Sequence, residues 1–254
     1  MDAIWPFVIL FLTGSIAGFV DSIAGGGGLI TLPVLLSMGF SPQDALGTNK
    51  LQATFGSGSA TWHFAQAGWV DFRASAAGIL FTAIGAVIGT VAVQSVDPTF
   101  LRRGIPWLLT AIALYTLLQP RLGEKDIMAR LDAGLFHAVF GLLLGFYDGF
   151  FGPGTGSFWA MAYMMGLGFN MTRATAHTKA MNLTSNLGSL LIFLAGQHVI
   201  FFAGLTMGLG QLLGARLGAR TVIRNGTRLV RPIFIAMVLA ITLKLFYENY
   251  FKRR

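Results

Sequence analysis

Four charged side chains interrupt stretches that are otherwise apolar: Asp21, Lys50, Asp148 and Lys179. An ionisable group inside an apolar segment is costly and usually faces a cavity or an opposite charge. Each lysine could supply a positive charge to an anion. Alternatively, it pairs with one of the two aspartates or extends to the membrane interface. Each aspartate could cap a helix start or carry a coupling proton, because burial favours the protonated carboxyl group.

Two glycine-rich breaks follow the aspartates, at residues 25–28 and 152–156. A helix that restarts after such a break presents unpaired N–H groups and the positive end of its dipole, which together attract anions. Alternatively, these glycines have no ligand and only allow two helices to cross closely. The breaks predict substrate contacts at Gly26, Gly27, Gly28, Gly154, Thr155 and Gly156.

Polar residues surround both lysines and could add hydrogen bonds to a bound anion. The predicted substrate-binding set therefore also contains Thr48, Asn49, Lys50, His177, Thr178 and Lys179. The side chain of His177 could titrate near neutral pH. Further polar residues follow, several of them at spacings of three or four that share one helical face. These residues could line a polar path, or they could form hydrogen bonds between neighbouring helices. The predicted path-lining residues are Gln52, Asn182, Ser185 and Asn186.

The composition favours a membrane protein and gives little support to other classes. Hydrophobic residues make up 54% of the 254, charged residues only 11%, and mean hydropathy is +0.68. The net charge of +8 comes without a basic stripe interleaved with aromatics, so no nucleic-acid partner is predicted. Cysteine is absent, and the four histidines lack metal-ligand spacing. We therefore predict no metal, no cofactor and no catalytic residue.

The apolar segments predict a polytopic all-α bundle. They lie approximately at residues 4–24, 29–40, 45–66, 72–96, 100–118, 131–151, 157–169, 174–196, 199–217 and 229–247. The segments at 29–40 and 157–169 are too short to cross a bilayer, which takes about 20 residues. The first segment lacks a basic flank and is interpreted as a retained helix. Arginines 216–231 suggest that the link before the last segment is cytoplasmic.

The two halves repeat each other. Five residues of the first half, Gly18, Phe19, Asp21, Gly25 and Gly27, recur in order as Gly145, Phe146, Asp148, Gly152 and Gly154. We predict two homologous repeats at residues 1–118 and 131–254, joined by a polar loop at 119–130. Each repeat would contain a glycine-broken helix pair followed by three transmembrane helices. If the short segment is a re-entrant hairpin the repeats are inverted, and if it is half of one broken helix they are parallel.

These motifs resemble the TauE/SafE family of sulfite-exporter-like membrane proteins. The resemblance rests on residues 18–28 (GFVDSIAGGGG), 46–52 (LGTNKLQ) and 174–179 (ATAHTK) running on to 184–186 (TSN), and it covers nearly the whole chain. It implies a bacterial cytoplasmic-membrane transporter of small anions such as sulfite and sulfonates. The second break departs from the first at Pro153 and Thr155, so the two sites need not be equivalent.

The predicted function is therefore secondary transport, with export of sulfite, sulfoacetate or another sulfonate. Proton coupling through Asp21 or Asp148 is one form of this hypothesis. Two alternatives stay open: a passive anion channel, and an integral-membrane enzyme acting on a lipid phosphate, for which no acid–base or metal set accompanies the lysines. The expected partners are the lipid bilayer and a small anion, and the oligomeric state is left open.

Overall fold

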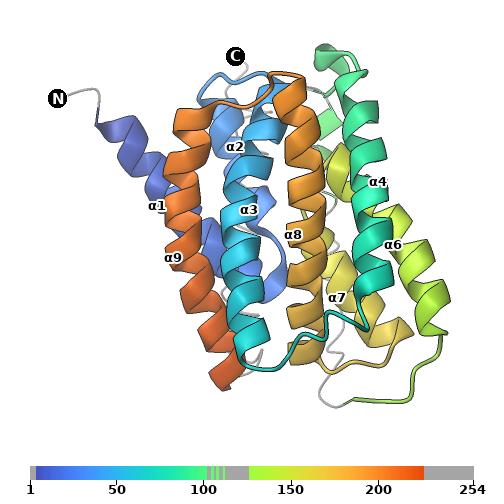
Figure 1. Ribbon diagram of the computed structural model, residues 1–254. Helices are drawn as coiled ribbons and strands as arrows, with labels where there is room; N and C mark the ends of the chain where they lie inside the picture. Colours follow the sequence, from blue (N-terminus) through green and yellow to red (C-terminus); the bar gives the residue numbers. More distant parts are fainter. Residues whose placement is uncertain (1–3, 102–103, 106, 109–110, 112–125, 226–254) are drawn as a thin grey trace.

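The structure is a computed structural model that describes residues 4–101, 104–105, 107–108, 111 and 126–225. Within these residues all regular secondary structure is helical, which confirms the all-α prediction. The predicted segment at 229–247 and most of that at 100–118 lie outside the described residues. The helices are α1 (Trp5–Ala24), α2 (Gly27–Ser37), α3 (Pro42–Gln66), α4 (Ala76–Gln94), α6 (Ala133–Phe150), α7 (Thr155–Gly166), α8 (Met171–Ala195) and α9 (Phe201–Asn225) (Figure 1).

Three of the described helices are long and apolar enough to cross a bilayer: Trp5–Ile23, Ala76–Gln94 and Ala133–Phe150. Their outer faces keep large apolar side chains exposed. On α4, for example, Leu80, Ile84 and Ile88 follow one another at intervals of four residues along an uncovered face. A stripe of this kind needs lipid around it, so the chain is a multi-pass membrane protein.

The two most polar helices occupy the centre of the bundle. α3 and α8 lie side by side, with α9 next to α3 and α4 next to α8 (Figure 1). α1 packs along α9, and α6 packs along α4. The faces of α3 and α8 that these neighbours bury can carry polar side chains across the apolar layer. Most of the buried polar residues lie on these two helices.

Glycines bring the outer helix pairs into backbone contact. A Cβ atom added to Gly14 of α1 would lie 2.1 Å from the carbonyl oxygen of Met207 on α9. A Cβ added to Gly149 of α6 would lie 2.1 Å from the carbonyl oxygen of Ala86 on α4. At these positions glycine serves close helix crossing, the role that small residues commonly have in membranes.

Helices α1 and α2 form a hairpin that starts and finishes at one end of the bundle, whereas α6 and α7 form a hairpin at the opposite end. At the first end, the ring of Phe7 contacts Phe202 at the start of α9, and α2 leads directly into α3. At the second, Arg130 before α6 donates its N–H to the carbonyl of Gly166, the last residue of α7, at 2.9 Å. We call this second end the arginine end.

The turn between α3 and α4, the stretch before α6, the start of α8 and the last part of α9 lie at the arginine end (Figure 1). These segments carry every arginine among the described residues: Arg73, Arg130, Arg173, Arg216, Arg220 and Arg224. The predicted boundary of the ninth segment at residue 217 was wrong, because α9 continues to Asn225. Its buried face continues through Ala215, Ala219 and Val222, while the last three arginines lie exposed at intervals of four. These three charges therefore lie on a solvated face of α9, whereas Arg228 and Arg231, which the prediction also used, lie outside the described residues.

Candidate functional site

The tips of the two hairpins meet inside the bundle, backbone against backbone. A Cβ atom added to Gly25 would lie 2.4 Å from Cα of Gly156, and one added to Gly156 would lie 2.5 Å from Cα of Gly25. Gly25, Gly152 and Gly154 also have φ angles of 74°, 97° and 82°, in the left-handed region that favours glycine. Side chains are thus excluded from the contact by space and by backbone conformation.

Two buried ion pairs connect the hairpins to the central helices. Lys50 Nζ of α3 lies 2.6 Å from Asp148 Oδ1 of α6, and Lys179 Nζ of α8 lies 3.0 Å from Asp21 Oδ2 of α1. Each lysine also donates to the main-chain carbonyl of the same aspartate. The pairing is crosswise, because each lysine reaches the aspartate from the other half of the sequence. Neither lysine extends to the membrane interface.

The two carboxylates differ in their second partner. Asp21 Oδ1 accepts the N–H of Gly27, the first residue of α2, at 3.3 Å. This is the contact expected if Asp21 caps the start of the helix. Asp148 instead accepts the hydroxyl of Ser185 on α8. The Asp21 side chain keeps 21% of its surface exposed, compared with 6% for Asp148. The two sites are therefore similar in plan and unequal in detail.

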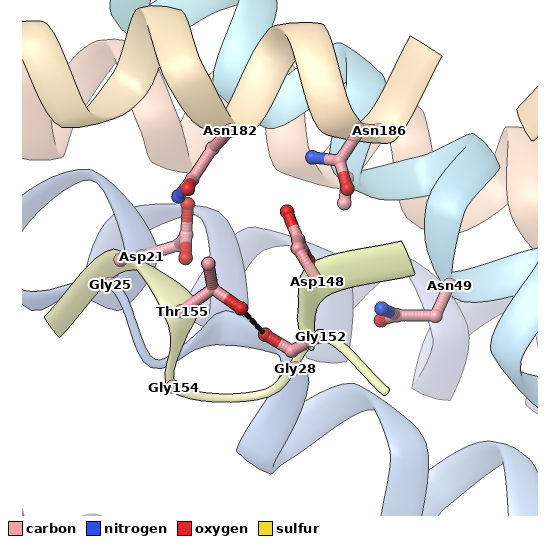
Figure 2. A pocket seen from close by; sticks show the side chains of 12 residues that line it. Asp21, Gly25, Gly28, Asn49, Asp148, Gly152, Gly154, Thr155, Asn182 and Asn186 are labelled. Atoms are coloured by element: carbon pink, nitrogen blue, oxygen red, sulfur yellow. Dashed lines mark hydrogen bonds between the residues drawn. The ribbon is translucent and has the colours of Figure 1, made fainter. Parts of the chain in front are cut away.

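A small polar cavity of about 30 Å³ lies between the hairpin tips and the central helices. Figure 2 shows Asn182 and Asn186 of α8 on one side of it, with Asp21, Asp148 and Thr155 facing them. A space of this size holds roughly one or two water molecules. The lining residues are Asp21, Gly25, Gly28, Asn49, Ala53, Asp148, Gly152, Gly154, Thr155, Gly156, Asn182 and Asn186.

Nine of the residues predicted from the sequence line this cavity: both aspartates, Gly28, Asn49, Gly154, Thr155, Gly156, Asn182 and Asn186. The other nine predicted residues do not line it. They are Gly26, Gly27, Thr48, Lys50, Gln52, His177, Thr178, Lys179 and Ser185. The lysines and Ser185 lie behind the aspartates that they contact.

Three of the non-lining residues make contacts elsewhere. Thr48 Oγ1 accepts the N–H of Ile200 at 2.9 Å, beside the start of α9. Gln52 donates to Asn49 Oδ1 at 2.7 Å and so holds that amide in place. His177 Nδ1 lies 2.8 Å from Ser75 Oγ, next to a different cavity. These contacts give Thr48 and Gln52 supporting roles and place His177 outside the central cavity.

Three residues that we did not predict from the sequence also line the cavity: Gly25, Ala53 and Gly152. A signal was present for the two glycines, because they open the breaks and recur in both halves. Ala53 follows Asn49 by four residues, so the helical period alone puts it on the same face. Its small side chain gave no chemical reason to select it.

The cavity offers polar hydrogen-bonding groups and a balanced charge. Two carboxylates line it, and the two ammonium groups that neutralise them lie directly behind. Helix α7 begins here after Gly154, and no side chain caps it. Asn182 Oδ1 is buried without a hydrogen-bond partner among the described residues. Among the described residues there is no group of three or more His, Asp or Glu side chains that could hold a metal ion. Such a cavity suits a small polar solute.

Comparison with known proteins identifies the family of the chain. The family model described as "Sulfite exporter TauE/SafE" matches residues 10–245. The "Probable membrane transporter protein YfcA" of Escherichia coli strain K12 is 46% identical over 242 residues, covering 95% of this chain and 90% of the relative. A "Probable membrane transporter protein" of Haemophilus influenzae is 45% identical over 241 residues, covering 95% and 94%. No solved structure matches the chain. The chain therefore belongs to the TauE/SafE sulfite exporter family of membrane transporters.

Proposed function

We propose that this protein is a secondary transporter of the bacterial cytoplasmic membrane that exports a small sulfur oxyanion, such as sulfite, sulfoacetate or another sulfonate. One observation carries the proposal: two hairpin tips meet around a polar cavity deep inside the bundle. Non-helical backbone at membrane depth is tolerated only where protein buries it or where it lines a cavity. In secondary transporters, such breaks surround the substrate.

The proposal includes two inverted repeats, residues 1–118 and 131–254. Several matched features support it. Helices α3 and α8 both contain 25 residues, and the short helices α2 and α7 contain 11 and 12. The hairpins enter from opposite ends, and the two ion pairs connect the halves crosswise. Rocking one repeat against the other would then open the central cavity to each side in turn.

The anion would bind against the start of α7, at the positive end of the helix dipole, where Gly156 lets a ligand approach the backbone closely. The amides of Asn49, Asn182 and Asn186 would add donors around it. At about 30 Å³ the cavity is tight for a four-atom oxyanion, so the hairpin tips would have to separate as the substrate enters. The inside-negative membrane potential favours export of an anion, by about 2.3 kcal/mol per charge for each 100 mV.

Lys50 and Lys179 would act on the anion through their aspartates. While each pair is intact, the lysine charge is neutralised and does not line the cavity. A proton on Asp21 or Asp148 would release the lysine and leave a net positive site, which favours an anion. Asp21 is the more exposed of the two carboxylates, so a proton from solvent would reach it more easily.

Reconstituted vesicles test this proposal. Efflux of labelled sulfite or sulfoacetate should saturate with concentration, and an imposed pH gradient should change its rate if a proton is coupled. Flux that rises linearly without saturation would instead support a passive channel. Phosphate release from a lipid phosphate by the purified protein would support the enzyme alternative. Absence of flux for all sulfur anions tested would refute the proposed substrate class.

We propose further that the arginine end faces the cytoplasm. All the described arginines lie there, and loops on the cytoplasmic side of membrane proteins carry an excess of lysine and arginine. With this orientation, the hairpin of α6 and α7 enters from the cytoplasm. The hairpin of α1 and α2 enters from the other side.

A further inference from the structure

A second, larger cavity of about 230 Å³ lies at the arginine end of the bundle. It is enclosed by residues beside α4, by the stretch that precedes α6, and by α6, α8 and the turn between α7 and α8. It shares no lining residue with the central cavity. The proposed transport path through the hairpin tips does not use it, so its side chains require a separate explanation.

Three basic side chains line this cavity: His137, Arg173 and His177. The Arg173 guanidinium lies 3.9 Å from the ring centroid of Phe169, which fixes it at the cavity wall while 41% of the side chain stays exposed. His177 is held in orientation by Ser75. His137 is 4% exposed, and its Nε2 has no hydrogen-bond partner among the described residues. A buried ring nitrogen without a partner indicates a missing polar ligand or water.

The hydroxyl-bearing Ser75 also lines the cavity, and the rest of the wall is apolar, formed by Leu167, Phe169 and three alanines, Ala74, Ala129 and Ala133. The nearby carboxylates lie at the edge of the cavity. Asp126 Oδ2 lies 3.7 Å from Arg173 Nη1 in an exposed pair, and Asp71 interacts electrostatically with both Arg173 and His177. No carboxylate lines the cavity itself. Its polar part is therefore cationic or hydrogen-bond donating, and its other part suits a short carbon skeleton.

We propose that this cavity, the vestibule site, binds a small organic oxyanion, a sulfonate or carboxylate with a short apolar group. Arg173 would supply the charge, and the two imidazoles would donate hydrogen bonds to the oxyanion. Leu167 and Phe169 would cover the apolar group. The site is separate from the central cavity, so its occupancy does not depend on the transport proposal.

Calorimetric titration of the full chain in detergent with benzenesulfonate tests the site. The wild type should bind, and Arg173→Gln and His177→Phe should each weaken the affinity by about tenfold or more. Asp126→Asn should tighten binding, because it removes the carboxylate that competes for Arg173 while the amide oxygen still accepts from Asn170. Arg224→Gln is the matched control, since it removes an exposed arginine at the same end of the bundle.

Each outcome is decisive for the vestibule site. No binding to the wild type, or equal affinity in wild type and Arg173→Gln, would overturn the proposal. Stabilisation by phosphatidylglycerol in nanodiscs, with no response to benzenesulfonate, would overturn it in favour of a lipid headgroup. Asn182→Ala, in the central cavity, should leave the vestibule affinity unchanged. A protein that binds in the vestibule but moves no anion would therefore refute the proposed function alone.

Discussion

The buried pair of Lys50 and Asp148 allows a quantitative test of how the two halves are held together. Replacing Lys50 by methionine leaves the Asp148 carboxylate buried, with only Ser185 and the surrounding backbone near it. Removing one partner of a buried ion pair costs about 3–5 kcal/mol, because an uncompensated charge stays behind. For a domain of this size, each kcal/mol corresponds to roughly 2–4 °C in Tm. Lys50→Met should therefore lower Tm by roughly 6–20 °C.

The double variant Lys50→Met with Asp148→Asn should recover much of this loss, because neither charge remains buried. The matched cycle on Lys179 and Asp21 should show a smaller coupling, since Asp21 is the more exposed carboxylate. Thermal unfolding of the purified protein in one detergent, followed by intrinsic fluorescence, measures all the variants. If the double variant is as unstable as the sum of the two single variants, the charges are not coupled and the reasoning is refuted.

Three further predictions concern the hairpins, the cavity and the orientation. Gly156→Ala forces the facing hairpin tip away and should reduce flux at least tenfold, whereas Gly58→Ala, which meets only a side chain at 3.7 Å, should not. Asn182→Ala should weaken substrate affinity about tenfold with little change in Tm, because its buried oxygen bonds no described residue. Because the chain has no cysteine of its own, a single introduced cysteine reports which side of the membrane its position faces. An impermeant maleimide should label Arg224→Cys from the cytoplasm and Asp97→Cys only from the opposite side.

Local rules in the sequence predicted the helices well, and they failed where the helix ends depend on capping. The third and eighth segments were expected to begin at residues 45 and 174. The structure begins them three residues earlier, at Pro42 and Met171. Ser41 and Asn170 accept the N–H groups of the third residue of each helix at 3.1 and 3.0 Å. Both are polar residues at the edge of an apolar run, so hydropathy excluded them although capping chemistry favours them.

The candidate site was harder to predict, because neighbours in a helical motif do not share a face. Thr48 and Lys50, and likewise His177 and Lys179, are two residues apart and so point to nearly opposite sides of their helices. Lys50 reaches the hairpin tip, while Thr48 contacts Ile200 near the other end. Asn182 and Asn186 are four residues apart and line the same cavity. Helical spacing, applied within each motif, would have separated these groups.

The crosswise pairing could not be derived from the sequence, because it depends on which hairpin contacts which central helix. That pairing has a mechanical consequence for the proposed transport cycle. Each lysine belongs to one half of the sequence and its carboxylate partner to the other, so the proposed rocking of the halves would strain both ion pairs at once. Protonation of one carboxylate, or arrival of an anion beside one lysine, weakens a contact that resists the motion. The same charges that stabilise the closed cavity would thus make its opening depend on the substrate.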